Sequence, residues 1–288
     1  MLELQLSYQP PYDWPAVLNF LNTRKVPGVE VIEAGEYRRS IRLNGQFSLL
    51  TVKQDAAKCQ LICSISPAPQ EARINLTQKL RSMFDLDADP IQIKSVLSQE
   101  SRLKPSIEEY PGLRIPGCWD GFETCVRAII GQQISVAGAI TIVGRLVERY
   151  GQTCDLGSGV AHAFPTALQL AENLVVEDMA MPRARAQALL LLSQACAPEG
   201  FIDFDLMEAD ELQVSLQKIK GIGPWTASYV ALRAMNQADV MPVEDLVLQK
   251  TLEPGRRLSA KELTQRAEVW RPWRGYATLH LWHLANQK

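Results

Sequence analysis

The sequence has no excess of positive charge, few histidines and no long hydrophobic run. Its 30 lysines and arginines are offset by 32 acidic residues, and the net charge is −2. A protein that coats nucleic acid is usually far more basic, so any such contact must be local. No apolar run approaches the about 20 residues of a membrane-spanning helix. The N-terminus, with Glu3 and no basic region, does not resemble a signal peptide. We therefore expect a cytoplasmic protein.

Cysteine is also scarce, and none follows residue 196. The cysteines are Cys59, Cys63, Cys118, Cys125, Cys154 and Cys196. Scattered thiols in a cytoplasmic chain are expected to be free rather than paired in disulfides. Cys59 and Cys63 alone cannot complete a four-ligand metal site.

The chain of 288 residues changes its pattern near residue 85. Before that point, runs at 29–32, 39–43, 47–52 and 60–65 predict antiparallel strands, interrupted by helices at 13–24 and 72–84. From Pro90 onward the apolar periodicity is helical. Helices are expected near 90–99, 120–132, 135–150, 166–173, 183–195, 208–219, 224–235, 244–252, 259–269 and 273–286. The pattern predicts an α+β protein whose N-terminal domain carries an antiparallel sheet and whose remainder is helical.

The segment from Leu216 to Lys250 is the most informative part of the chain. It predicts a helix, a tight turn at Gly221-Ile222-Gly223 and a second helix that begins at Pro224. Two glycines one residue apart permit a turn with positive φ and a close approach to a ligand. The free N–H groups and the positive end of the second helix suit a phosphate. An ordinary helix-turn-helix corner would use the same residues.

Two carboxylates follow this second helix. Asp245 stands shortly after Pro242 and near the start of another expected helix, beside Glu244. Adjacent helical positions point about 100° apart, so only one of the two can face a given cleft. Asp245 could simply cap the helix, a frequent role for aspartate.

These residues together resemble the helix-hairpin-helix DNA glycosylases. Further motifs, in the same order along the chain, resemble the AlkA family of 3-methyladenine DNA glycosylases. They are Tyr8-Gln9-Pro10-Pro11-Tyr12-Asp13-Trp14, Leu113-Arg114-Ile115-Pro116-Gly117, Arg127-Ala128-Ile129-Ile130-Gly131-Gln132-Gln133-Ile134-Ser135 and Trp270-Arg271-Pro272-Trp273-Arg274-Gly275-Tyr276. The resemblance implies a TBP-like α/β domain at 1–85, a helical domain at 86–230 with the hairpin at 216–230, and a C-terminal helical subdomain at 231–288 that packs with 86–115.

The implied function is that of a monofunctional glycosylase in base excision repair. It would flip an alkylated purine, such as 3-methyladenine or 7-methylguanine, out of double-stranded DNA and hydrolyse its N-glycosidic bond, leaving an abasic site. The resemblance assigns catalysis to Asp245 and places Glu244 at the pocket edge. Trp225 occupies the position at which bifunctional relatives carry a lysine nucleophile, and no lysine lies between Gly221 and Leu246. We therefore expect no strand cleavage.

The resemblance also implies a base pocket and a DNA-contacting surface. Aromatic side chains commonly stack on a flipped base, and each of these could instead belong to the core. The implied pocket residues are Trp225, Tyr229, Trp273, Glu244, Phe20 and Arg24. The implied DNA contacts are Gly221, Ile222, Gly223, Trp225 and Thr226, with Gln133 as the plug that fills the vacated space. At the position of Gln133, several AlkA-like proteins carry leucine.

Cofactor and partner expectations follow from the same resemblance. The carbonyl oxygens of Gln217, Ile219 and Gly221 match those that bind a monovalent cation, and hard oxygen ligands suit sodium or potassium. The iron–sulfur cluster of some relatives requires four C-terminal cysteines and is excluded. The histidines His162, His280 and His283 are expected at the surface or in packing. We expect a monomer whose partner is double-stranded DNA.

Two alternatives remain open. One is a DNA-binding protein that keeps the hairpin but has no catalytic activity, against which the presence of Asp245 with three candidate pocket aromatics argues. The other is a glycosylase for oxidised or deaminated purines, because the depth of the pocket sets the lesion that is accepted.

Overall fold

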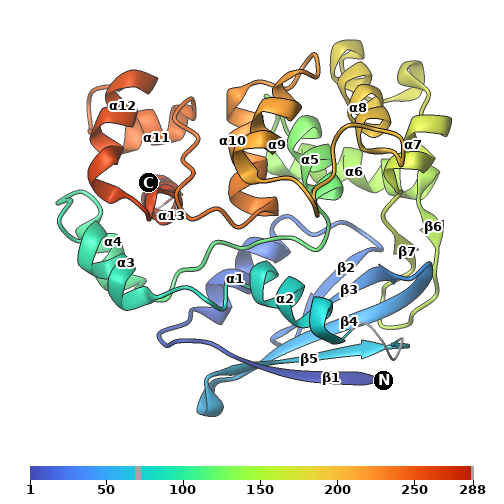
Figure 1. Ribbon diagram of the computed structural model, residues 1–288, viewed down its shortest axis with the longest axis horizontal. Coiled ribbons are helices and arrows are strands. Elements are labelled where there is room, and N and C mark those ends of the chain that lie inside the picture. Colours follow the sequence, from blue (N-terminus) through green and yellow to red (C-terminus); the bar gives the residue numbers. More distant parts are fainter. Residues whose placement is uncertain (69–72, 287–288) are drawn as a thin grey trace.

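The computed structural model describes residues 1–68 and 73–286. Within them, a five-stranded antiparallel sheet forms the base of the molecule (Figure 1). Its strands are β1 (Leu2–Ser7), β2 (Glu30–Glu33), β3 (Glu36–Leu43), β4 (Gln46–Asp55) and β5 (Gln60–Ser66). The strand order is β1-β5-β4-β3-β2. A second, short ladder joins β6 (Gln152–Thr153) to β7 (His162–Ala163). The sequence pattern anticipated β2 to β5 but not β1.

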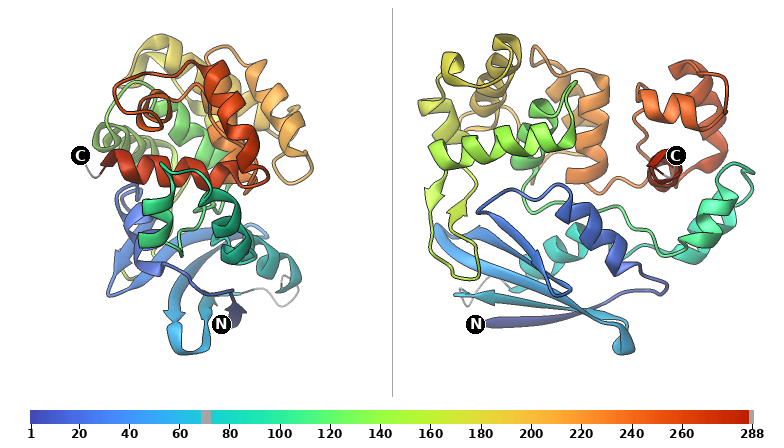
Figure 2. Two further views of the ribbon diagram at one scale, coloured as in Figure 1. Left: turned by 90° about the vertical axis from the view of Figure 1, so that its left-hand side faces the viewer. Right: turned by 180° about the vertical axis from the view of Figure 1, so that it is seen from behind.

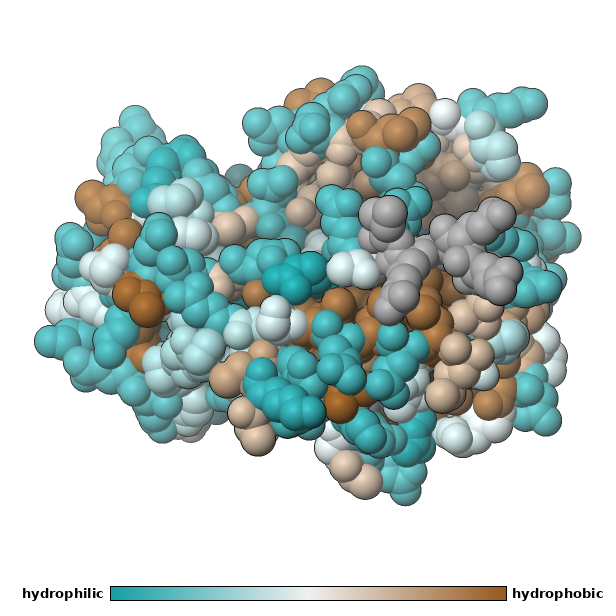
Figure 3. Space-filling view, turned by 60° about the horizontal axis from the view of Figure 1, so that its bottom comes forward, coloured by the Kyte–Doolittle hydropathy of each residue, from teal (hydrophilic) through white to brown (hydrophobic). Residues whose placement is uncertain are grey.

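One face of the sheet is covered by α1 (Trp14–Asn22) and α2 (Arg73–Met83) (Figure 2). The predicted start of the second helix at Ala72 lies outside the described residues. The strands alternate in burial, so that Leu50, Val52 and Ile65 face these helices and are fully buried. The underside, brought forward in Figure 3, mixes hydrophilic and hydrophobic residues. Among the described residues, no large hydrophobic side chain of the sheet is exposed.

Helices make up most of the remaining chain. They are α3 (Pro90–Leu97), α4 (Lys104–Glu109), α5 (Gly121–Ile130), α6 (Val136–Tyr150), α7 (Ala167–Asn173), α8 (Arg183–Cys196), α9 (Ala209–Gln217), α10 (Pro224–Ala234), α11 (Leu246–Thr251), α12 (Ala260–Ala267) and α13 (Arg274–Asn286). Short 3₁₀ turns occur at Ala56–Lys58, Val176–Asp178 and Glu268–Trp270. Many starts are capped locally: Asp13 accepts a hydrogen bond from Ala16 N, and Ser135 accepts one from Gly138 N. The α+β fold predicted from the sequence is confirmed.

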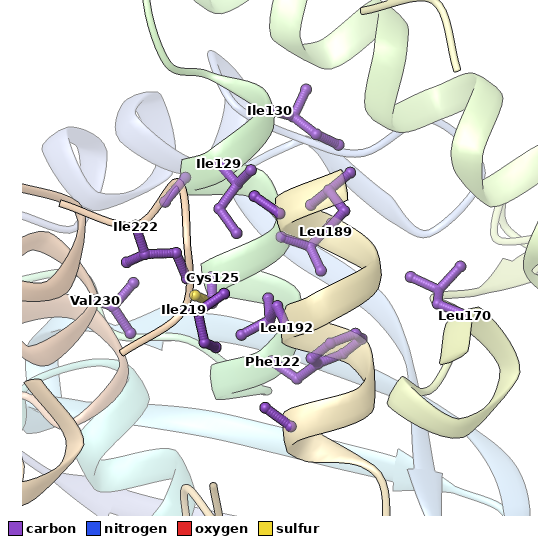
Figure 4. Packing of buried hydrophobic residues seen from close by; sticks show 14 of the residues in the cluster. Phe122, Cys125, Ile129, Ile130, Leu170, Leu189, Leu192, Ile219, Ile222 and Val230 are labelled. Carbon is purple, nitrogen blue, oxygen red and sulfur yellow. The ribbon is translucent and has the colours of Figure 1, made fainter. Parts of the chain in front are cut away.

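The buried apolar residues form three separate clusters. The first lies between the sheet, α1 and α2. The second joins α5 to α10 and includes Phe122, Leu189 and Ile222 (Figure 4). The third joins buried residues of 88–115 to those of 232–281. We propose three structural units from this division: 1–85, 86–230 and 231–288, with 86–115 packed on the last.

A buried group of charges connects the sheet to the helical part. Arg39 of β3 donates to Glu123 of α5 at 2.6 Å, and Arg127 donates to Glu123 at 2.9 Å and to Glu30 at 3.2 Å. Burial raises the pKa of Glu30, but the two guanidinium groups outweigh it and the pKa is lowered. Arg127 also donates to the carbonyl of Arg24. The network therefore fixes the end of α1 against α5.

Candidate functional site

The hairpin between α9 and α10 adopts the predicted tight turn, but only one of its glycines has positive φ. Gly221 has φ of 101°, and a Cβ there would lie 2.8 Å from Cβ of Ala188 on α8. Gly223 has φ of −94° and precedes α10 as its N-cap. A Cβ on Gly223 would meet nothing within 4 Å. The expectation of positive φ was therefore wrong for Gly223, which leaves open space at the helix start.

The apolar residues of the hairpin point into the protein. Ile219 and Ile222 lie near Cys125 of α5 and Val230 of α10 in Figure 4, and all belong to one buried cluster. Gly221, Gly223 and Pro224 remain exposed. The first N–H groups of a helix have no acceptor within that helix. The hairpin therefore presents backbone donors on a firmly packed support.

A cavity of about 1270 Å³ lies where the N-terminal domain meets both helical groups. Its walls come from the end of α1, from the α5–α6 region, from α10, from the segment before α11, and from α13. Among the residues that line it are Phe20, Arg24, Trp225, Tyr229, Arg233, Asp245, Trp282 and His283.

Asp245 is the carboxylate that reaches this cavity from the α10–α11 connection. Its Oδ1 accepts hydrogen bonds from Val247 N at 2.8 Å and Leu248 N at 3.1 Å, so it caps α11. Its Oδ2 accepts one from Trp225 Nε1 at 2.8 Å. The residue is 7% exposed. These three donors orient the carboxylate. Asp245 therefore caps α11 and faces the cavity at the same time.

Glu244 does not share this environment. It is exposed and does not line the cavity. The turn in which Asp245 N donates to Pro242 O at 2.9 Å directs only the second of the two carboxylates inwards. The geometry therefore separates two residues that the sequence alone could not distinguish.

The aromatic wall contains two of the three expected residues. The rings of Trp225 and Tyr229 are stacked with centroids 5.3 Å apart and an interplanar angle of 10°. Trp282 of α13 follows, 6.3 Å from Tyr229. Trp273 does not line the cavity; it packs on Tyr276 at 5.8 Å and against the third cluster. The assignment of Trp273 to the pocket was wrong, because its place before α13 turns it towards the core.

The sequence reasoning missed Trp282, which occupies the wall instead. It also missed Arg233, although Trp225, Tyr229 and Arg233 are spaced by four residues and therefore share a face of α10. That spacing was a usable signal. Trp282 lies two turns inside α13, and nothing in the local sequence distinguishes its face from that of Trp273.

Guanidinium groups lie beside this aromatic wall and also line the cavity. Two guanidinium groups lie over the Phe20 ring, with Cζ of Arg24 at 4.0 Å and of Arg233 at 4.5 Å from its centroid. Arg233 donates to Tyr229 Oη at 2.8 Å. Burial raises the pKa of the Tyr229 phenol, but Arg233, Arg24 and Arg127 outweigh it, so the pKa is lowered. Burial also lowers the pKa of Arg24.

One histidine lies at the cavity. His283 lines it, with its ring centroid 4.0 Å from that of Tyr110. His280 is buried and shares a 2.9 Å hydrogen bond with Ser106, as a packing residue would. Burial, and then the nearby His283, lower the pKa of His280 to about 4.

The loop between α5 and α6 borders the cavity. Gln133 is exposed and has φ of 59°, in the left-handed region that few non-glycine residues adopt. Gly131 and Ile134 on either side line the cavity. Gln133 therefore lies at the rim, where a residue that enters a duplex would have to be.

Two of the three carbonyl groups expected to bind a cation, those of Ile219 and Gly221, already accept hydrogen bonds from the protein. Ile219 O accepts from Ile222 N at 3.0 Å, and Gly221 O accepts from Gln132 Nε2 at 3.1 Å. Each carbonyl has a second lone pair for a ligand. Over the described part of the chain, no group of three or more His, Cys, Asp or Glu residues could bind a metal ion.

Two further findings concern the chain as a whole. All six cysteines are free, and Cys63, Cys125 and Cys154 are buried. Within residues 1–68 and 73–286, no helix combines the length and the apolar character that crossing a membrane requires.

The fold and this site define a helix-hairpin-helix DNA glycosylase. Residues 3–120 match the family described as AlkA N-terminal domain. DNA-3-methyladenine glycosylase 2 of Escherichia coli is 34% identical over 96% of this chain and 96% of its own. The chain belongs to the AlkA family of DNA-3-methyladenine glycosylases.

Other comparisons agree with this assignment. The probable bifunctional transcriptional activator/DNA repair enzyme AlkA of Mycobacterium tuberculosis is 34% identical over 99% of this chain, which spans 58% of that protein. The solved 3-methyladenine DNA-glycosylase from Archaeoglobus fulgidus has the same fold. Its TM-score is 0.83 at 22% identity, over 99% of this chain and 98% of that one.

Proposed function

We propose that this protein hydrolyses the N-glycosidic bond of alkylated purines in double-stranded DNA and leaves an abasic site. The observation that carries the proposal is the oriented carboxylate of Asp245, which lines a cavity together with Trp225, Tyr229 and Trp282. Its bond to Trp225 Nε1, at 2.8 Å, connects the catalytic group directly to the aromatic wall. A flipped base on that wall would bring its sugar close to Asp245.

The chemistry requires little beyond this arrangement. Breaking the bond develops positive charge on the sugar, which a nearby carboxylate stabilises. An N-alkylated purine such as 3-methyladenine carries positive charge and is already a good leaving group. A cation over an indole or phenol ring gains about 0.5–2 kcal/mol, and Trp225, Tyr229 and Trp282 offer three such rings. Water then adds to the sugar.

The proposed contacts with DNA adjoin the cavity, because Trp225 of α10 and Gly131 and Ile134 of the α5–α6 loop line it. The amides around Gly223 and the first turn of α10, with Ile222 and Thr226 as support, would bind a backbone phosphate. Gln133 would fill the space that the flipped base leaves. The carbonyl oxygens of Gln217, Ile219 and Gly221 would bind sodium or potassium, a hard cation suited to oxygen ligands. We propose that the protein acts as a monomer.

We further propose that the enzyme does not cleave the strand. A lyase step requires an amine that forms a Schiff base with the sugar. Trp225 occupies the hairpin position of that amine, and no described residue lining the cavity is a lysine. Borohydride should therefore trap no covalent adduct with methylated duplex DNA. Efficient trapping in a homogeneous preparation would contradict the proposal and direct attention to Lys250.

A second substrate class is favoured by the charges around Phe20. Arg24 and Arg233 would repel a cationic base that entered deeply and would attract the carbonyl of a neutral purine such as hypoxanthine or an oxidised guanine. Duplexes that each carry one defined lesion test the order of preference. Faster excision of alkylated purines supports the main proposal, and faster excision of the neutral, carbonyl-bearing purines supports this alternative.

A further inference from the structure

One side chain joins the two elements that are proposed to contact DNA. Nε2 of Gln132, in the α5–α6 loop, donates to Gly221 O and to Thr226 Oγ1, both at 3.1 Å. Gly221 belongs to the hairpin turn and Thr226 to the first turn of α10. An amide nitrogen has two hydrogens, so both donors of this group are used.

The hairpin is the firm side of this connection. Gly221 lies against Ala188 with no room for a Cβ, and Ile222 and Thr226 are 5% and 2% exposed. The loop is the weakly packed side. Residues 133–135 are all exposed, and Ile134 is 38% exposed. The hydrogen bonds of Gln132 therefore position the loop on the hairpin, and not the hairpin on the loop.

The next residue is the one that this connection would position. Gln133 follows directly, in the left-handed conformation with φ of 59°. That conformation is costly for a residue with a Cβ and persists where its surroundings determine it. A neighbour anchored by two hydrogen bonds provides such surroundings.

We propose that Gln132 is a positioning residue that fixes Gln133 at a set distance from the hairpin phosphate site. Phosphate binding at the hairpin and insertion of Gln133 into the duplex then occur as one event. This inference rests on the proposed function, because it assumes that the hairpin and Gln133 both contact DNA. Gln132 itself is not among the residues that line the cavity.

The test uses binding, so that it does not depend on excision. The probe is a duplex with a tetrahydrofuran abasic analogue opposite 2-aminopurine, whose fluorescence rises when the plug unstacks it. Gln132→Leu removes both hydrogen bonds at similar size. Two neutral hydrogen bonds together correspond to about a tenfold change in an equilibrium constant. We expect Kd to rise about tenfold and the fluorescence increase to shrink, with the melting temperature measured in parallel.

The decisive comparison is the double variant. If Gln132 acts through its neighbour, Gln133→Ala alone weakens binding, and adding Gln132→Leu to it has no further effect. The inference would be overturned if the two increases in Kd multiply in the double variant, or if Gln132→Leu alone leaves Kd unchanged. Thr226→Val removes one of the two acceptors. It should show about a threefold rise in Kd that also disappears beside Gln133→Ala, and it serves if Gln132→Leu folds poorly.

Failure of the proposed function would look different. In that case the wild type excises no base from any lesion duplex, while the binding comparison is still measurable. Normal excision by the wild type with independent effects of Gln132 and Gln133 would reject only the positioning role.

Discussion

Asp245→Asn separates the charge of this residue from its structural bonds. Asparagine keeps Oδ1, which accepts from Val247 N at 2.8 Å and Leu248 N at 3.1 Å, and asparagine caps helices about as well as aspartate. It replaces Oδ2 by an amide that faces Trp225 Nε1, now a donor without an acceptor. Leaving a buried donor unpaired costs about 1–3 kcal/mol. A modest loss of stability is therefore expected.

The effect on catalysis should be much larger. A carboxylate about 4 Å from the developing charge contributes roughly 4 kcal/mol at an effective dielectric of about 20. That corresponds to roughly a thousandfold in rate. Single-turnover excision from methylated duplex DNA, with enzyme in excess, measures this step without contributions from product release. We expect the rate to fall by about that factor while duplex binding remains.

Two further variants distinguish charge from misfolding. Glu244→Gln removes the same charge from the exposed neighbour and should change the rate less than about threefold, because exposed charges are strongly screened. Combining Asp245→Asn with Trp225→Phe removes the unpaired donor, so the melting temperature should recover while excision does not. An excision rate of Asp245→Asn within about tenfold of the wild-type rate would refute the catalytic role of Asp245. If Glu244→Gln lowered the rate more than Asp245→Asn does, the catalytic role would belong to Glu244.

Three other changes test separate parts of the site. Gly223→Ala should leave the melting temperature nearly unchanged, because its Cβ meets nothing within 4 Å. It should nevertheless weaken duplex binding, measured by filter binding, and the affinity should depend only weakly on salt. A steep dependence of affinity on salt concentration would contradict this phosphate site. Trp282→Ala should raise KM about tenfold through lost stacking, whereas Trp273→Ala should mainly lower the melting temperature, and the reverse order would restore Trp273 to the pocket. The pKa of His280 is about 4 in the folded protein, against about 6.5 in the unfolded chain. As the pH falls below about 6.5, His280 is therefore protonated in the unfolded chain before it is protonated in the folded protein. Stability should then fall by roughly 3 kcal/mol between pH 6.5 and 4, and urea unfolding of His280→Asn should lack this contribution. Burial raises the pKa of Asp85 to about 6, which opposes this loss of stability as the pH falls. The contribution of His280 is therefore obtained from the difference in unfolding free energy between the wild type and the variant at each pH.

Local signals in the sequence predicted most elements of the fold. Gly223 and Pro224 mark the start of α10, which was expected at 224–235 and runs over Pro224–Ala234. Proline fixes φ and glycine permits conformations that other residues avoid, so both act on the backbone locally and such boundaries need no distant partner. By contrast β1 was missed, although Leu2, Leu4 and Leu6 alternate. Its pairing, such as Leu4 with Cys63, depends on a strand far along the chain.

The candidate site was predictable where the resemblance matched it residue by residue, and Phe20, Arg24 and Tyr229 line the cavity as it implied. Asp245 and Trp225 lie at the cavity as the resemblance implied. The sequence could not show which of Trp273 and Trp282 lines the cavity, because the side of α13 that faces the cavity depends on packing with other helices. Gln132 could not be identified either. Its role depends on two hydrogen bonds across 89 and 94 residues of sequence.

The most direct measurement is the chromatographic identification of bases released from methylated duplex DNA, run with wild type and Asp245→Asn side by side. The account predicts that the wild type releases free 3-methyladenine and 7-methylguanine and leaves intact strands that break only after alkali. Asp245→Asn should release neither above background. No free alkylated purine from a folded, DNA-binding wild type, or equal release by both proteins, would contradict it.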